Sequence, residues 1–470
     1  MILERGVLMQ ESYKEPFRNQ FHFSPKAGWM NDVNGVWFDE GVYHLTYQAY
    51  PYATHWDSMH WGHAVSTNLI HWTQKNPVLI PGVNTAGMAY SGSAVIDRTD
   101  TAGFGENSCF LFYTDTARGQ CMAYSTDHGE TFRDYEHNPV VCLPELAVEG
   151  ADKTWQRDPK VFWDTATARW YMVVFREKDP IHDHVDHFYT SSDLLHWERI
   201  EDFVGDKFWE CPDMYALPLD GDVSAMYWVL QSGTSHYYIG HFDGKRFLPI
   251  EYPDEYLDYG PDFYAGQTFS NMPDGRTVAM YWLERWNGST VSTAPWIHAA
   301  TIPCELKLIT TSEGMRVIRY PVQELQTIWR NEHSWSAIIE PEKNPLSHIQ
   351  ADTYDLKMEF DLRNSSVTSI CLQLRGKEYQ ISLIDETLSG SFVRPDTSEE
   401  QAYTVSCKGI SQRLSLRILG DRDCIEIFIN EGRYNYTEEY GFDPENTRLL
   451  VFSDARLPCT IQYAEMDSCW

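Results

Sequence analysis

The sequence has no stretch of 18 uncharged apolar residues, and this absence excludes a membrane-spanning helix of ordinary length. Its first 21 residues mix charged side chains with short apolar runs, so they lack the apolar core of a secretory signal. We therefore expect a cytoplasmic protein that has no membrane as a partner. An extracellular location stays open for a chain from which a signal has been removed.

Cysteine and glycine patterns that hold cofactors are also missing. The ten cysteines form no CxxC pair and no zinc-type pairing with histidine, which excludes a zinc ribbon and a thioredoxin-like motif and fits reduced thiols. The glycine-rich segments lack the spacing of a Walker or dinucleotide-binding loop. We expect neither a metal nor a cofactor.

Positive charge is scarce. The chain has 37 Lys and Arg against 68 Asp and Glu, a formal net charge of -31, and this charge repels phosphate backbones. Nucleic acid is therefore excluded as a partner. The 17 Trp and 28 Tyr offer flat amphipathic faces that suit sugar rings, although aromatic residues also fill ordinary cores.

Short strand-like runs separated by turns dominate the first two thirds of the chain, and long stripes of helical period are almost absent. Residues 36–38 and 42–48, for example, flank the turn at 39–41. Many short strands at regular spacing predict an all-β sandwich, barrel or propeller.

Internal repeats favour the propeller. The segment 66–72 (STNLIHW) recurs as 191–197 (SSDLLHW), with weaker copies at 125–132 and 241–247. In chain order the copies begin 59, 66 and 50 residues apart, which suits one four-stranded blade with its loops. We predict that each copy is the turn between outer strands and that its closing Trp or Phe packs between blades.

Three acids hold a common place in this repeat. Asp32, Asp158 and Glu210 precede the next copy by 34, 33 and 31 residues, which puts each near the start of its blade. Because innermost strands line the central channel of a propeller, we expect the three acids to converge at one funnel. Segments 89–95 and 258–265 occupy the same position relative to the repeat, so the pattern predicts five blades in all.

The strand pattern of the sequence changes after the predicted propeller. We predict a five-bladed β-propeller over residues 1–325, a linker over 326–340 and a C-terminal β-sandwich over 341–470, whose strands include 413–419 and 424–429. The sandwich carries no convincing catalytic cluster.

The stretch 28–35 (GWMNDVNG) joins an aromatic face, an amide and the Asp32 carboxylate to an Asn-Gly turn. A turn needs only the Asn-Gly, whereas sugar chemistry uses the whole mixture. The alternative is an Asx-turn that closes a hairpin, with Asp32 bonded to its own backbone.

Two further stretches complete the chemistry. Arg157 stands beside Asp158 and would keep it ionised, unless the two form a surface ion pair. Glu210 lies between Trp209 and Cys211, and partly apolar surroundings raise the pKa of a glutamate. An ionised carboxylate, a protonated one and a third charge are the minimum for cleaving a glycoside.

The histidines give weaker evidence for a functional site than these acids do. His182, His184 and His187 permit a metal site, but Asp183 and Asp186 among them favour a solvated turn. His60 and His63 flank a Trp-Gly pair in a strand, where packed and hydrogen-bonded histidines are the rule.

The motifs at 29–35 (WMNDVNG), 157–159 (RDP) and 210–212 (ECP) resemble those of glycoside hydrolase family 32, the β-fructosidases, in sequence, order and spacing. Segments at 59–64, 90–93, 258–265 and 421–430 extend the resemblance over nearly the whole chain. It implies a retaining mechanism in which Asp32 is the nucleophile, Glu210 the acid/base and Asp158 a stabiliser of the transition state. The Asp32 and Glu210 carboxyl groups should then lie about 5 to 5.5 Å apart.

The same resemblance implies a set of substrate-binding residues: Asn31, Gln48, Trp56, Tyr90, Ser91, Arg157, Asp262, Trp282 and Trp286. Val33 departs from the family's usual proline, and Asp57 stands where glycine is common. Asp57 could narrow the entrance or bind a hydroxyl of the leaving sugar.

We expect an enzyme that releases terminal β-D-fructose from levan-type or inulin-type fructans and fructooligosaccharides, and from sucrose. An invertase, a sucrose-6-phosphate hydrolase and a fructosyltransferase are the alternatives, although no basic cluster for a phosphate is evident. A non-catalytic sugar-binding propeller fits less well, because a binding module has no use for a proton donor at Glu210.

Overall fold

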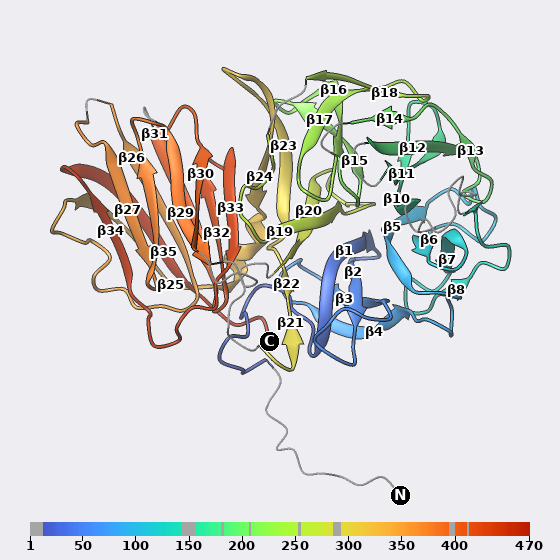
Figure 1. The fold of residues 1–470 in the computed structure, drawn as a ribbon, viewed down its shortest axis with the longest axis horizontal. Helices are drawn as coiled ribbons and strands as arrows, with labels where there is room; N and C mark the ends of the chain where they lie inside the picture. Colours follow the sequence, from blue (N-terminus) through green and yellow to red (C-terminus); the bar gives the residue numbers. More distant parts are fainter. Residues whose placement is uncertain are drawn as a thin grey trace, which may run out of the picture.

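The computed structural model describes residues 13–142, 156–179, 183–205, 208–251, 255–284, 293–363, 365–393, 400–410 and 413–470. These residues form strands and one short 3-10 helix, η2 (Gln323–Ile328). Within these ranges no helix is long and apolar enough to cross a membrane. Figure 1 shows two bodies side by side, a propeller in blue to yellow and a sandwich in orange and red.

The first three blades are separate antiparallel sheets. Blade 1 contains β1 (Gly28–Asp39), β2 (Val42–Tyr50), β3 (His60–Ser66) and β4 (Thr73–Leu79), with β21 (Trp296–Ile297) added beside β1. Blade 2 contains β5 (Ala89–Asp97), β6 (Ser108–Asp115), β7 (Gly119–Ser125), β8 (Arg133–Asp134) and β9 (Val141–Cys142). Blade 3 contains β10 (Gln156–Asp164), β11 (Arg169–Asp179), β12 (Asp183–Ser191), β13 (Glu198–Arg199) and β14 (Phe203–Val204).

The last two blades are joined by one parallel pair, Leu219 with Leu308. Blade 4 contains β15 (Asp213–Leu219), β16 (Asp222–Gln231), β17 (Tyr237–Phe242) and β18 (Phe247–Glu251). Blade 5 contains β19 (Phe263–Thr268), β20 (Thr277–Leu283), β22 (Ala299–Ala300), β23 (Cys304–Thr311) and β24 (Gly314–Pro321). The first strands of the five blades, β1, β5, β10, β15 and β19, contact one another in a closed ring (Figure 1). The predicted five-bladed propeller is confirmed.

The sequence repeats occupy the predicted turns. Residues 66–72 connect β3 to β4, 125–132 connect β7 to β8, 191–197 connect β12 to β13, and 241–247 connect β17 to β18. In the first three of these turns a Ser hydroxyl donates to an Asn or Asp side chain two residues later. The closing aromatics lie between blades: Phe132 contacts Trp37 of blade 1, and Trp197 contacts Phe112 of blade 2.

Buried histidines fill the interior of blade 1, as expected for His63. The rings of His44 and His63 stack at 5.3 Å, and His44 Nδ1 lies 3.0 Å from His63 Nε2. Burial lowers the pKa of His63 to about 3, so the ring packs as a neutral group.

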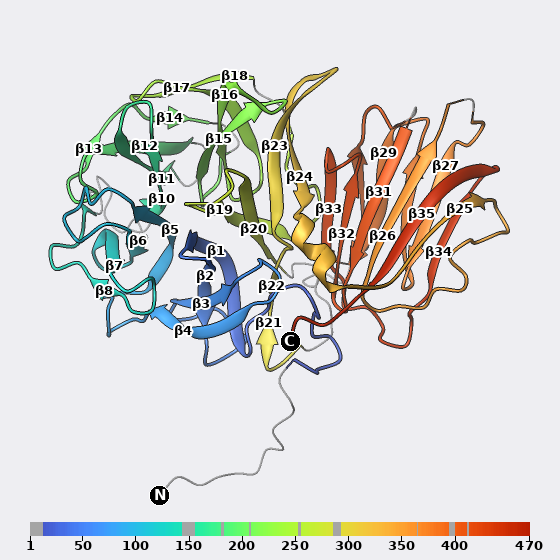
Figure 2. The same cartoon turned by 180° about the vertical axis from the view of Figure 1, so that it is seen from behind.

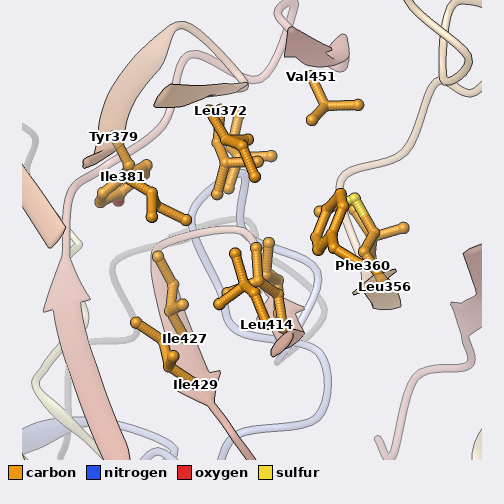
Figure 3. Packing of buried hydrophobic residues seen from close by; sticks show 14 of the residues in the cluster. Leu356, Phe360, Leu372, Tyr379, Ile381, Leu414, Ile427, Ile429 and Val451 are labelled. Carbon is orange, nitrogen blue, oxygen red and sulfur yellow. The ribbon is translucent and has the colours of Figure 1, made fainter. Parts of the chain in front are cut away.

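The sandwich has a six-stranded and a five-stranded sheet. The first contains β25 (Trp329–Ile339), β35 (Leu457–Met466), β26 (Tyr354–Asp361), β31 (Arg413–Gly420), β32 (Cys424–Ile429) and β33 (Tyr434–Glu439), and the second contains β30 (Glu400–Ser406), β29 (Thr387–Val393), β28 (Lys377–Ser382), β27 (Ser369–Leu374) and β34 (Leu449–Ser453). Apolar side chains from both inner faces meet between the sheets, among them Leu372 and Ile381 opposite Leu414 and Ile427 (Figure 3). This alternation is the ordinary pattern of a sandwich core.

One part of the predicted division differs from the structure. Residues 326–340, expected as a linker, contain β25, which pairs with β35 along its length. The β-type alternation of this segment is weak, because most of its side chains are exposed or half-buried on an edge strand.

A buried charge network joins the two bodies, and we call it the junction network: Arg319, Asp258, Glu426, His22 and Asp421. The Arg319 guanidinium contacts Asp258 at 2.5 Å and Glu426 at 2.9 Å. The His22 ring contacts Asp421 at 2.9 Å and Glu426 at 3.0 Å. Figures 1 and 2 both show the sandwich strand β33 beside β24, the propeller strand that carries Arg319.

Candidate active site

Asp32 lies on β1 within a shift in the pairing with β2, between the paired residues Met30 and Val33. Val33 itself is buried in the blade core. The Asp32 carboxylate accepts hydrogen bonds from Ser91 Oγ (2.5 Å), Asn31 Nδ2 (3.2 Å) and Cys211 Sγ (3.3 Å). These partners come from three blades, so the Asx-turn alternative is wrong. Burial, and then the neighbouring Glu210, raises the pKa of Asp32.

Asp158 lies near the start of β10 with its backbone in the left-handed region, at φ +63°. Its N–H donates to Thr114 Oγ1 at 3.0 Å, and its carboxylate accepts the N–H of Cys211 at 3.1 Å. The side chain is buried, which rules out the surface ion pair with Arg157. Burial raises the pKa of Asp158 to about 7, and the Arg157 guanidinium opposes this shift, which is the effect expected of a neighbouring cation.

Glu210 lies in the turn before β15, where Glu210 (φ +22°) and Cys211 (φ +48°) are also left-handed. Strained non-glycine backbone of this kind concentrates at functional sites. Arg157 donates from Nε (3.0 Å) and Nη2 (2.8 Å) to Glu210 Oε2, and Tyr264 donates to Oε1 at 2.7 Å. The carboxylate of Glu210 therefore lies against a cation and a phenol, and not in the apolar surroundings that we expected.

These groups share one cavity of about 840 Å³. Its wall includes the three predicted catalytic acids and seven of the nine predicted binding residues: Asn31, Gln48, Trp56, Tyr90, Ser91, Arg157 and Trp282. The acids of blades 1, 3 and 4 thus converge on one funnel. The separation of the Asp32 and Glu210 carboxyl groups stays a prediction.

Two of the expected binding positions are not in this wall. Asp262 is fully buried and accepts the N–H of Glu439 from the sandwich at 2.8 Å, so it ties the two bodies together. Trp286 lies outside the described residues. Asp57 is exposed and accepts the N–H of Ser58 at 2.7 Å, and it is also absent from the wall.

Four further residues of the candidate site were not predicted from the sequence. Cys211 and Tyr264 bond the catalytic acids, and their proximity to predicted motifs was the available signal. Asn34, in the amide orientation that satisfies its bonds, donates to Ser91 Oγ at 3.1 Å and so supports the Ser91 bond to Asp32. Glu284 lines the cavity two residues after Trp282, which strand alternation alone predicts.

No group of three or more His, Cys, Asp or Glu in the described part of the chain has the arrangement of a metal site. Of the three histidines considered as ligands, His187 is buried beside Asp202, and burial lowers its pKa to about 4. The position of His182 and the side chain of His184 lie outside the description.

Known proteins resemble this chain along its whole length. The sequence profile of the glycosyl hydrolases family 32 N-terminal domain matches residues 22–321, and that of the family 32 C terminal matches 324–458. A levanase of Bacillus subtilis is 35% identical over 91% of this chain, which spans 66% of the levanase. The extracellular exo-inulinase of Aspergillus niger is 28% identical over 99% of this chain and 97% of its own length.

Solved structures show the same fold. The exo-inulinase of Aspergillus awamori has a TM-score of 0.84 and 25% identity, covering 97% of this chain and all of the other. A β-fructofuranosidase of Schwanniomyces occidentalis has a TM-score of 0.82 at 23% identity, over 98% of this chain and all of the other. The chain belongs to glycoside hydrolase family 32.

Proposed function

We propose that this protein is a retaining β-fructosidase that releases terminal β-D-fructose from fructans or fructooligosaccharides and from sucrose. The observation that carries the proposal is the placement of Asp32 and Glu210 in one cavity, each fixed by its own set of donors. Two carboxyl groups that flank a glycosidic bond are the equipment of a glycosidase, and the retaining mechanism requires them to lie about 5 to 5.5 Å apart.

The reaction then has two steps. Asp32 attacks the anomeric carbon of the fructosyl unit, the bond to the leaving oxygen breaks, and Glu210 gives its proton to that oxygen. In the second step Glu210 takes a proton from water, the water oxygen attacks the same carbon, and Asp32 leaves. Cys211 bonds both Asp32 and Asp158, so it keeps the nucleophile and the non-reacting acid in a fixed relation.

Uncharged sugars suit this cavity better than phosphorylated ones. Among the described residues of its wall, Arg157 is the cation, and two of its N–H groups are engaged by Glu210. The wall also carries Glu177, and a carboxylate repels a phosphate. We therefore rank sucrose 6-phosphate below sucrose and fructan.

The test is to supply sucrose, sucrose 6-phosphate, inulin and levan separately, and to follow free fructose, free glucose and longer products by chromatography. Free fructose from sucrose and from a fructan supports the proposal. Longer products in place of free fructose indicate a fructosyltransferase, which shares the covalent intermediate and differs in the second acceptor. No fructose from any of the four contradicts the hydrolase.

A further inference from the structure

Glu284 is a fourth acid in the cavity wall, and the two-step mechanism does not use it. It follows β20, on the same face as Trp282, while Leu283 between them points into the core. Its backbone N–H donates to the carbonyl of Asp262 at 2.9 Å, which fixes the chain at this point. Glu284 therefore has a defined place beside the nucleophile.

The carboxyl group of Glu284 is partly buried and has no hydrogen-bond partner in the described part of the chain. The group lines a cavity that is open to substrate, so a hydroxyl group of the sugar is the partner that the position can receive.

The surroundings decide which form of the acid is present. Burial, and then the charges of Asp32, Asp262 and Glu210, raises the pKa of Glu284 to about 9. A carboxylic acid that keeps its proton at neutral pH can donate a hydrogen bond, which an ionised carboxylate cannot do.

We propose that Glu284 is a specificity-determining residue that binds a hydroxyl oxygen of the terminal fructosyl unit by donating its own O–H. This inference rests on the proposed function, because it names a sugar as the ligand. Trp282 places the donor: its ring lies 6.5 Å from Trp29 on the nucleophile strand and 6.1 Å from Tyr264, the partner of Glu210. Glu284 thus lies on the wall that connects the nucleophile to the acid.

The test compares Glu284→Gln with Glu284→Ala on whichever substrate the wild-type protein cleaves. The glutamine amide donates a hydrogen bond at every pH, so kcat/KM should stay within about threefold of wild type at pH 7. The alanine variant has no donor, and its kcat/KM should fall about tenfold, mainly through a higher KM. Glu130→Gln, a change at an exposed carboxylate of the propeller, is the matched control.

The pH dependence separates binding from a structural role. As the pH rises from about 6 to about 10, Glu284 loses its proton, so the wild-type KM should rise relative to that of Glu284→Gln. A constant ratio of the two KM values, or equal kcat/KM for wild type and Glu284→Ala, would overturn the inference and leave the proposed function intact. A wild-type protein that cleaves none of the four substrates would instead overturn the proposed function.

Discussion

Two sets of buried carboxylates lie in this molecule, and they differ in the charges that surround them. In the junction network, the Glu426 carboxylate contacts the Arg319 guanidinium and the His22 ring and accepts the N–H of Ile302. These partners hold the pKa of Glu426 at about 2, although burial opposes this shift. In the cavity, burial and the neighbouring acids raise the pKa of Asp158 to about 7.

The difference separates a structural role from a chemical one. Junction acids are ionised and paired, so they stabilise the contact between propeller and sandwich. Asp258 departs from this pattern, because burial raises its pKa although Arg319 opposes that shift. Cavity acids are crowded, and burial together with neighbouring carboxylates raises the pKa of Asp32 and of Asp158. Shifts of this kind are concentrated at functional sites.

The largest expected effect comes from removing the nucleophile. Asp32→Asn should lower kcat by at least about 10⁴-fold, because no covalent intermediate can form. The melting temperature should not fall, since the change removes one charge from a repulsive set. Initial rates and thermal unfolding measure the two effects, and a rate within tenfold of wild type would contradict the role of Asp32.

The next effect is on stability and lies in the junction network. Arg319→Met leaves Asp258 and Glu426 buried without their guanidinium partner, and should lower the free energy of unfolding by about 3 to 5 kcal/mol. Denaturant titration measures it, with kcat of the folded fraction expected to be unchanged. Arg330→Leu is the control, because that arginine is half exposed in its ion pairs and should contribute little. An equal loss in both variants would remove the special role of the junction.

The smallest effect is a pH dependence of opposite sign in the two sets. The folded pKa of Asp158 lies above its ordinary value of 3.8, so this site loses stability as the pH rises from about 4 through about 7. Asp158→Asn should therefore unfold at a higher temperature than wild type at pH 8, and at no higher temperature at pH 4. The folded pKa of Glu426 is lowered, so its stabilisation is present above its ordinary pKa of 4.5 and is lost as the pH falls towards about 2.

Thermal unfolding of wild type, Asp158→Asn and Glu426→Gln across this pH range checks both signs. Glu426→Gln should lose stability at neutral pH and approach wild type in acid. The same pH trend in both variants would contradict the distinction between the two sets.

Sequence predicted the convergence of the cavity acids, because the repeats fix the phase of the innermost strands. Asp32, Asp158 and Glu210 share that phase. The spacing alone therefore predicted that their side chains line one cavity, as they do. The propeller itself followed from the same repeats. Location in the cell stays a prediction.

Contacts across long sequence distances could not be predicted in this way. Arg157 bonds Glu210 as well as neighbouring Asp158, and His22 meets Asp421 399 residues later. Buried charged side chains have no period that distinguishes them from surface ones. Asp262 is an example: the resemblance implied that it binds the sugar, whereas its buried carboxylate accepts the N–H of Glu439 in the sandwich.

The central claim is that Asp32, and not Asp158, forms the bond to the sugar. The most direct measurement is to mix Glu210→Ala with a fructosyl substrate that has a good leaving group, to quench the reaction in acid, and to analyse the peptides by mass spectrometry. The account predicts that the peptide containing Asp32 gains the mass of one fructosyl unit. A label on the peptide containing Asp158, or an unlabelled protein whose product has the inverted anomeric configuration, would contradict it.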